Sequence, residues 1–310
     1  MKKLITVSVP VYNERDNIRS VYDRTTAVCE KLTDYEYEMV FFDDGSTDGS
    51  REIIESLAAE DSHVRAVFYT RNFGYTKNIF YSMQQTKGDC AILLHADLQN
   101  PPELIPEFIK KWEEGAQIVQ GVKSSSKENR FMYFMRTMFY ILMDKLFGVP
   151  LVRHATEFEL FDRSFLDLLK EIKHNKIFLR NIVIEYGQKT EYVKYVQDKR
   201  RAGRSKFNLN KYYDLSIEAI VDASRCLPRR IIAVCGVLLA LLIAESVVFF
   251  VKNSASMTLP QIENSIIIRV ILAGILCLSV LLCFIFEYII GVLERTETKP
   301  FICEERRINY

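Results

Sequence analysis

The sequence predicts an α/β domain built on a mainly parallel sheet, followed by two membrane-spanning helices. Short apolar segments alternate with amphipathic ones through the first 120 residues, which is the pattern of strands joined by covering helices. Acidic residues follow two of these apolar segments directly. Two long stretches near the C-terminus are almost free of charge. A chain of 310 residues is long enough for one sizeable domain, here 1–225, and an appendage, 226–310.

The expected strands are short apolar runs, at residues 4–9, 37–42, 64–69, 90–94 and 117–120. Residues 14–32 predict the first helix, because Ile18, Val21 and Val28 recur on related turns. A second helix is expected to begin near Thr47, and another at Pro101, since helix first turns favour acids and tolerate proline. The chain contains no Gly-x-Gly and no Gly-x-x-x-x-Gly-Lys, so the dinucleotide fingerprint and the phosphate loop are both absent.

The composition excludes several classes of function. A formal net charge of +1 argues against a nucleic-acid binder that works through bulk charge. The seven cysteines are scattered and include no Cys-x-x-Cys, which fits a reducing compartment and neither a disulfide scaffold nor a zinc site. The N-terminus runs straight into a strand pattern without the apolar segment of a signal peptide, so we expect the first domain to stay in the cytoplasm.

Two apolar stretches, at about residues 231–251 and 266–290, are long enough to predict membrane spans. Within the first, Glu245 and Ser246 are the exceptions. The alternative is a pair of buried helices in a soluble domain, but nothing later in the chain would cover them.

Charges near the spans predict their orientation and assembly. Arg225, Arg229 and Arg230 precede the first span, so the positive-inside tendency places the domain and the short tail on the cytoplasmic side of the cell membrane. Glu245 and Arg269 would lie at similar depth in an antiparallel pair, and charges in membranes tend to pair. They join either within one chain or between subunits, and the second arrangement favours a homo-oligomer, with a tetramer among the candidates.

Residues 131–147 are almost wholly apolar and aromatic, but they are too short and too charged for a span. One interpretation is an interfacial helix that lies along the lipid headgroups, and the other is a core helix. We favour the interfacial helix, because membrane spans follow it.

The residues that close the fourth expected strand carry the strongest functional signal. His95, Asp97 and Gln99 place an imidazole, a carboxylate and an amide at its carboxyl end, where ligands bind in open α/β sheets. These donors suit a divalent cation, Mg²⁺ or Mn²⁺, that holds phosphates. Asp43 and Asp44 close the second expected strand. The two acidic strand ends together predict a site for a nucleotide diphosphate and its metal.

A basic run at residues 199–211 holds six Lys or Arg side chains and no acid. Gly203 and Ser205 interrupt it, which gives a flexible backbone and a hydroxyl among the cations. This combination favours phosphate binding over a solvated face or a purely electrostatic membrane contact.

Six segments in order resemble glycosyltransferase family 2: VPVYNE at 9–14, DDGSTDG at 43–49, RNFG at 71–74, GD at 88–89 leading to DLQ at 97–99, FELFDR at 158–163, and RAGRSK at 201–206. With two C-terminal spans, the chain resembles the branch that glycosylates a polyprenyl phosphate, the dolichyl- or undecaprenyl-phosphate hexose synthases. The resemblance covers essentially the whole chain.

The resemblance implies a GT-A (Rossmann-like) fold and an inverting transfer from a nucleotide-diphosphate sugar to the polyprenyl phosphate. The nucleotide-binding residues that it implies are Pro10, Tyr12, Glu14, Asp43 and Asp44. The implied catalytic residues are Asp97 and Glu157, and the implied metal-binding residues are Asp97, Gln99 and His95. The residues implied at the acceptor phosphate are Arg201, Ser205 and Lys206.

The chain departs from the family pattern at two places. Relatives usually carry Asp-x-Asp where this chain has His95 and Asp97, so His95 either ligates the metal, which favours Mn²⁺ over Mg²⁺, or packs near the strand end. Relatives tend to show Asp-Phe-Arg-Leu at 157–160, where this chain has Glu157 and Glu159. Glu157 keeps a carboxylate that orients the sugar or acts as base, whereas Glu159 changes how the donor sugar or the acceptor is held.

Two other functions remain as alternatives. Direct transfer to a polysaccharide or glycolipid is disfavoured, because the Gln-x-x-Arg-Trp motif of processive synthases cannot exist around the single tryptophan, Trp112. A catalytically impaired scaffold that binds nucleotide sugars is the other alternative, motivated by His95 and Glu159.

Overall fold

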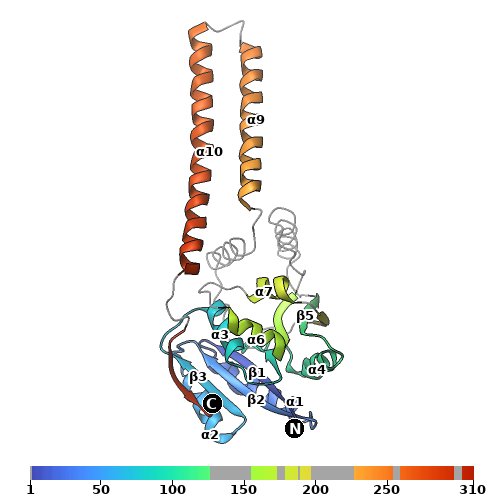
Figure 1. The fold of residues 1–310 in the computed structure, drawn as a ribbon. Coiled ribbons are helices and arrows are strands. Elements are labelled where there is room, and N and C mark those ends of the chain that lie inside the picture. Colours follow the sequence, from blue (N-terminus) through green and yellow to red (C-terminus); the bar gives the residue numbers. More distant parts are fainter. Residues whose placement is uncertain are drawn as a thin grey trace.

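The structure is a computed structural model that describes residues 2–125, 155–172, 179–187, 189–196, 227–253, 259–296 and 302–310. Within these residues one sheet is the framework of the domain, with strand order β7-β5-β6-β4-β1-β2-β3-β8 (Figure 1). The strands are β1 (Lys3–Val11), β2 (Tyr35–Asp43), β3 (Val64–Tyr69), β4 (Cys90–Leu93), β5 (Ile118–Ser125), β6 (Ala155–Asp162), β7 (Thr190–Val196) and β8 (Glu304–Ile308).

The middle of the sheet is parallel and its additions are mixed. β1 pairs in parallel with β2 and β4, and β2 pairs in parallel with β3. β6 runs antiparallel to both β4 and β5, β7 is parallel to β5, and β8 is antiparallel to β3. The carboxyl ends of β1, β2 and β4 and the amino end of β6 therefore share one edge of the sheet.

Helices cover both faces of the sheet because its central strands are apolar on both. On β4, Ile92 belongs to one hydrophobic core, while Leu93 belongs to the core on the opposite face. The helices of the first core are α1 (Arg15–Cys29), α2 (Ser50–Glu60) and α4 (Ile105–Glu113), which the short η1 (Pro102–Leu104) precedes. The helices of the second core are α3 (Tyr75–Gln85), α6 (Arg163–Glu171) and α7 (Leu179–Tyr186).

These elements confirm the α/β class and the mainly parallel sheet. The five expected strands are all present, although β5 runs on to Ser125. The first helix is shorter than expected, at Arg15–Cys29, and the second begins at Ser50. The strands β6, β7 and β8 were not predicted from the sequence. The expected interfacial helix at 131–147 lies outside the described residues.

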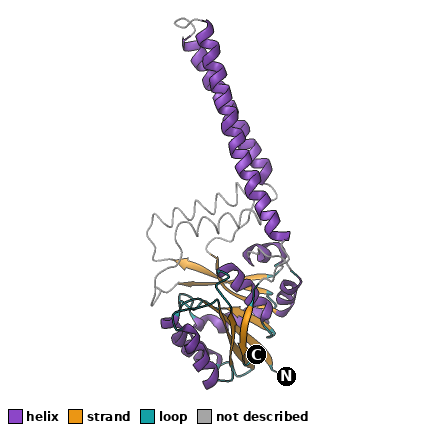
Figure 2. Cartoon of the chain, turned by 90° about the vertical axis from the view of Figure 1, so that its left-hand side faces the viewer, coloured by secondary structure: helices purple, strands orange, loops and turns teal. Residues whose placement is uncertain are grey.

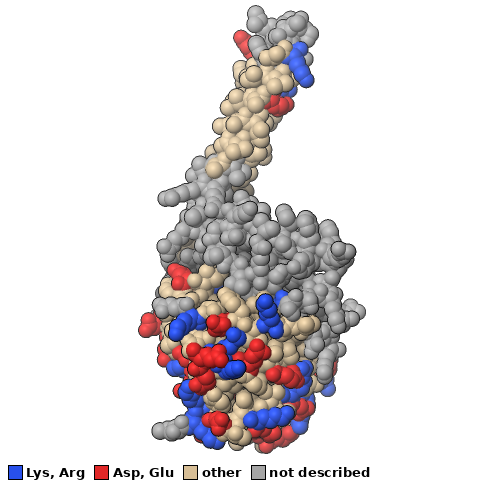
Figure 3. All heavy atoms as spheres, turned by 90° about the vertical axis from the view of Figure 1, so that its right-hand side faces the viewer, with Lys and Arg blue, Asp and Glu red and all other residues tan. Residues whose placement is uncertain are grey.

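Two long helices, α9 (Leu227–Asn253) and α10 (Leu259–Thr296), lie side by side and extend away from the sheet (Figures 1 and 2). On the face that Figure 3 shows, charged side chains crowd the domain, whereas the visible part of the helices is largely uncharged. Glu263–Phe286 in α10 is long and apolar enough to cross a membrane, whereas the apolar stretch of α9, Cys235–Phe249, is shorter. One helix of the described chain thus has the length and composition of a membrane span, and the prediction of two membrane-spanning helices is not confirmed.

The predicted pairing of Glu245 with Arg269 is confirmed within one chain. Arg269 Nη1 lies 3.6 Å from Glu245 Oε1, and the Arg269 guanidinium lies 3.7 Å from the centre of the Phe249 ring. Because the pair forms between α9 and α10 of the same chain, it does not require a second copy. The homo-oligomer stays a prediction.

Candidate active site

Predicted site residues from two strands meet at the edge of the sheet. In the antiparallel register of β4 and β6, Leu93 lies opposite Glu159. Toward the edge of the sheet, His95 lies two residues after the end of β4, and Glu157 lies near the amino end of β6. The register therefore brings two residues together that are more than 60 positions apart in the chain.

Tyr75, the first residue of α3, connects these two side chains. Its hydroxyl donates a hydrogen bond to Glu157 Oε2 and lies 3.5 Å from His95 Nε2. Its ring also stacks on the His95 imidazole, with ring centres 5.9 Å apart and planes 24° apart. From α7, Arg180 Nη2 approaches to 3.9 Å of Glu157 Oε1. The Glu157 carboxylate is thus half-buried between a hydroxyl and a guanidinium.

Glu159 lies below this cluster, in the interior. It is 1% exposed, and Gln120 Nε2 donates a 2.6 Å hydrogen bond to its Oε1. Burial raises the pKa of Glu159 to about 8, and the nearby charge of Glu157 adds to that rise against the opposing effect of Arg180. Glu159 is therefore mostly protonated at neutral pH. Any influence on a substrate passes through its neighbours, because its own side chain does not reach the surface.

Asp97 and Gln99 lie in the loop that follows β4. Asp97 Oδ1 accepts a 3.2 Å hydrogen bond from the Gln99 backbone, and Leu98 between them adopts a positive φ of 57°. The tight turn keeps His95, Asp97 and Gln99 half-buried at the edge of the sheet. No group of three or more His, Cys, Asp or Glu side chains in the described part of the chain has the arrangement of a complete metal site.

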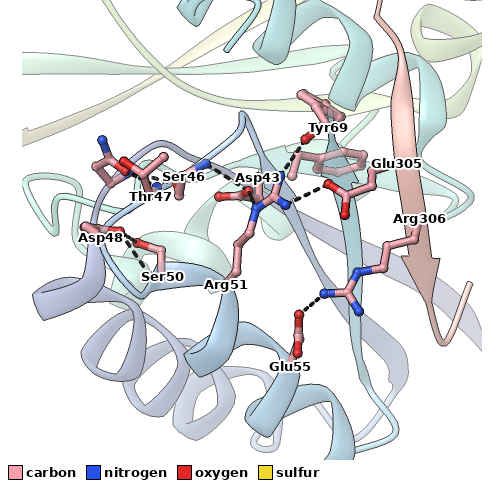
Figure 4. Close-up of polar contacts among 12 residues, drawn as sticks. Asp43, Ser46, Thr47, Asp48, Ser50, Arg51, Glu55, Tyr69, Glu305 and Arg306 are labelled. Carbon is pink, nitrogen blue, oxygen red and sulfur yellow. Dashed lines mark hydrogen bonds and ion pairs between the residues drawn. The ribbon is translucent and has the colours of Figure 1, made fainter. Parts of the chain in front are cut away.

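The turn that follows β2 buries both of its acids, each against a different partner, and Figure 4 shows the contacts of the first, Asp43. Asp43 is 0% exposed and accepts hydrogen bonds from Arg51 Nε at 2.8 Å and from the Ser46 backbone at 3.1 Å. Asp44 accepts from the backbones of Phe73, at 2.7 Å, and Gly74, at 3.0 Å. Burial raises the pKa of Asp44 to about 6, although these two hydrogen bonds lower it.

Gly45 allows this turn to pack directly against the next loop. It adopts a positive φ of 70°, and a Cβ atom there would lie 2.6 Å from the Arg71 carbonyl carbon and 2.7 Å from the Asn72 nitrogen. Any other residue would force the two backbones apart. The DDGSTDG and RNFG motifs are therefore two sides of one contact.

Hydrogen bonds also join the turn after β1 to the turn after β2. The Asn13 backbone donates to Ser46 Oγ at 2.8 Å, and the Thr47 backbone donates to Asn13 Oδ1 at 2.7 Å. The Glu14 backbone donates to Ser50 Oγ at 3.0 Å. The structure thus brings together the predicted nucleotide-binding residues of both turns, with Tyr12 exposed and Pro10 half-buried.

Three residues of this region, Tyr75, Arg51 and Arg180, were not predicted from the sequence, and three predicted residues lie outside the described part of the chain. Tyr75 immediately follows the RNFG motif, so the motif marked this segment, but nothing in the sequence predicted the contacts of Tyr75 itself. Arg51, in the helix that follows the DDGSTDG motif, and Arg180 were not predicted, since each reaches a partner on another element. The predicted acceptor residues Arg201, Ser205 and Lys206 lie outside the described residues.

The fold and this polar edge define an α/β enzyme of the GT-A type, and comparison with known proteins identifies the family. The model of glycosyl transferase family 2 matches residues 6–187, more than half of the chain. The chain belongs to glycosyl transferase family 2, as its motifs predicted, and is a glycosyltransferase.

The chain is also similar to individual proteins of known sequence or structure. The chain is 33% identical to the uncharacterized glycosyltransferase YkcC of Bacillus subtilis, over 95% of this chain and 91% of that protein. It is 35% identical to the bactoprenol glucosyl transferase of Shigella phage SfX, over 76% of this chain and 77% of that one. Glucosyl-3-phosphoglycerate synthase from Mycobacterium tuberculosis, solved with Mn²⁺, uridine diphosphate and glucosyl-3-phosphoglycerate, aligns with a TM-score of 0.47 and 20% identity, over 71% of this chain and 78% of that chain.

The contact at Gly45 generates the first prediction. Gly45→Ala adds a methyl group against the backbone of the facing loop, so we expect the free energy of unfolding to fall by roughly 2–4 kcal/mol, measured by chemical denaturation of purified protein. Gly115→Ala is the control, because Gly115 also has a positive φ, of 99°, but the added methyl would meet only the flexible end of the Lys189 side chain, at 3.7 Å. Equal losses in the two variants would show that backbone strain, and not the packing of the two loops, determines the effect.

The buried Glu159 generates a prediction about pH. Its pKa is raised from 4.5 to about 8 in the folded protein, so between these values the folded state holds a proton that the unfolded state has lost. The stability contributed by this group is therefore greatest below about pH 4.5 and falls as the pH rises toward 8.

Glu159→Gln keeps the hydrogen bond from Gln120 but has no proton to lose. At pH 8 the variant should be more stable than the wild type by on the order of 2–4 kcal/mol, and the difference should shrink toward pH 5, as measured by unfolding across that range. Glu191→Gln, an exposed glutamate of β7, should follow the wild-type curve. A stability gap for Glu159→Gln that does not vary with pH would contradict the assigned titration.

Proposed function

We propose that this glycosyltransferase moves a sugar, with inversion, from a nucleotide-diphosphate sugar to a polyprenyl phosphate at the cytoplasmic surface of the cell membrane. The observation that carries the proposal is the 35% identity, over 76% of the chain, to a protein named for glucosyl transfer to bactoprenol. A lipid acceptor also accounts for the two long helices after the catalytic domain, which a glycosyltransferase with a soluble acceptor does not need.

The exposed apolar surface of α9 and α10 supports a membrane location. Side chains such as Leu241, Leu272 and Phe286 are more than half exposed, and apolar surface on this scale is unfavourable in water. The chain after α10 returns to the domain and forms β8, so both ends of the helix pair lie on the domain's side. Two membrane crossings would place both ends on that side, and Arg225, Arg229 and Arg230, which precede the apolar stretch of α9, favour the cytoplasmic side.

The joined turns after β1 and β2 supply the proposed nucleotide site. Asp43 Oδ1 is buried and has no hydrogen-bond partner among the described residues, which is unfavourable by about 1–3 kcal/mol. An N–H of the base or a ribose hydroxyl is the type of donor that would satisfy this oxygen. Tyr12, exposed beside it, offers a ring for stacking on the base, and Pro10, Glu14 and Asp44 complete the proposed site.

The residues after β4 fit a divalent cation. A carboxylate from Asp97, an amide from Gln99 and an imidazole from His95 are donors that Mn²⁺ accepts, and Mg²⁺ would use the first two. These three side chains would hold the cation beside the bound diphosphate. Such a cation, when bound, offsets the charge that develops on the departing nucleoside diphosphate.

The chain's own residues would orient the reacting groups. An oxygen of the acceptor phosphate, largely anionic at neutral pH, attacks the anomeric carbon as the nucleoside diphosphate leaves from the opposite side, which inverts the configuration. Glu157, held between Tyr75 and Arg180, is the group proposed to orient the sugar. Arg201, Ser205 and Lys206 are the proposed ligands of the acceptor phosphate.

The experiment combines purified full-length protein with candidate nucleotide sugars, undecaprenyl phosphate and either Mn²⁺ or Mg²⁺. The expected products are a free nucleoside diphosphate and a lipid-linked sugar that mild acid releases. A product joined through an acid-stable glycosidic bond would favour direct transfer to a polysaccharide or glycolipid. Protein that binds nucleotide sugars but turns over none of them would favour the scaffold.

Asp97→Asn provides the corresponding prediction for a single residue. Removing this carboxylate should lower turnover by about 10²–10³-fold or more, because the charge on the leaving group would lose its stabilisation, while the unfolding temperature stays near that of the wild type. Asp23→Asn, an exposed carboxylate on α1, is the control and should retain full activity. Turnover of Asp97→Asn within about threefold of wild type would exclude the assigned role.

A further inference from the structure

The end of the chain is part of the same sheet as the proposed nucleotide site. β8 follows the two long helices and pairs antiparallel with β3, with Ala66 opposite Ile308 and Phe68 opposite Arg306. β3 in turn pairs with β2, whose last residue is Asp43. Residues about 260 positions apart in the sequence therefore lie two strands apart.

Arg51 of α2 joins this last strand to the buried acid. Its Nε donates to Asp43 Oδ2 at 2.8 Å, its Nη1 to Glu305 Oε2 at 2.7 Å, and its Nη2 to the Tyr69 carbonyl at 2.5 Å (Figure 4). Each nitrogen of the guanidinium thus has its own acceptor, on β2, β8 and β3 respectively. The planar group cannot rotate without breaking at least one of these bonds.

We propose that Glu305 is a positioning residue for the nucleotide site: it holds the Arg51 guanidinium in the orientation that keeps the Asp43 carboxylate in place. The inference rests on the proposed function, in which Asp43 belongs to the nucleotide-binding turn. Glu305 follows both long helices in the chain and lies outside residues 6–187, which match the family model, and the inference gives it a role in binding the donor.

The differing exposure of the three side chains supports this role. The Asp43 side chain is 0% exposed and that of Arg51 is 22% exposed, whereas that of Glu305 is 45% exposed. A buried carboxylate depends strongly on its cation, because water does not replace a lost partner. The hydrogen bond from Arg51 lowers the pKa of Glu305, so Glu305 remains an anion at neutral pH and anchors the outer side of the guanidinium.

Other contacts hold the tail in place without Glu305, which makes its positioning role separable from simple attachment. Ile302 is buried against the core of β2 and β3, and Asn309 Nδ2 donates to the carbonyls of Ala58 and Val64. Arg306, the next residue of the strand, forms an ion pair with Glu55 of α2. The Glu55 pair resembles the Glu305 pair in chemistry and location but does not contact Asp43.

The test compares Glu305→Gln with Glu55→Gln in the purified full-length chain. Uridine, guanosine, cytidine, adenosine and thymidine diphosphates are first titrated against the wild type by calorimetry, and the tightest of them becomes the probe. We expect Glu305→Gln to raise the Kd of the probe and the KM of the matching nucleotide sugar by about fivefold with kcat little changed, and Glu55→Gln to leave all three within about twofold. Both variants should lower the unfolding temperature by a similar small amount.

A second variant tests whether Glu305 acts through Arg51. Glu305→Gln should have no further effect on the Kd in an Arg51→Gln background, since the connection to Asp43 is already lost there. If the effects of Glu305→Gln and Arg51→Gln on the Kd of the probe are fully additive, the inference is wrong. It is also wrong if Glu305→Gln binds the probe like the wild type. Should Arg51→Gln not fold, the comparison of Glu305→Gln with Glu55→Gln decides alone. A wild-type protein that binds none of the five diphosphates would instead refute the proposed function, and this role with it.

Discussion

The antiparallel register between β4 and β6 is the constraint on which the candidate active site depends. Because side chains alternate along a strand, a slip of one residue would turn Glu157 and Glu159 to the opposite face and separate Glu157 from Tyr75 and His95. The register is held by the cores on both faces of these strands, in which Leu160 and Phe161 are fully buried on opposite sides. The geometry of the polar edge is thus determined by apolar packing several residues away.

Three acids near this edge are buried, and each is stabilised in a different way. Asp43 has a guanidinium from Arg51, Asp44 has two backbone N–H groups, and Glu159 retains its proton beside Gln120. Ion pairing and N–H donors stabilise a carboxylate as an anion, whereas protonation avoids burying the charge. Burial raises the pKa of Asp44 to about 6 and that of Glu159 to about 8, so it shifts both groups toward their protonated forms.

The sequence predicted the parallel centre of the sheet and both acidic strand ends, because apolar runs followed by acids are visible within a short window. It did not predict β6, in which Glu157 and Glu159 interrupt the apolar pattern, or β8, an edge strand of mostly charged residues, EERRI. Arg51 and Arg180 were missed for a related reason. Their partners lie on other elements, so neither the spacing nor the composition around them carries a signal.

The position of β8 also determines the order in which the protein can be completed during synthesis. Every strand that precedes α9 is made before the long helices, but β3 keeps an unpaired edge until residues 304–308 have been translated. An open strand edge readily pairs with other chains. The complete sheet, and with it the contact between Glu305 and Arg51, therefore forms after both long helices have been translated.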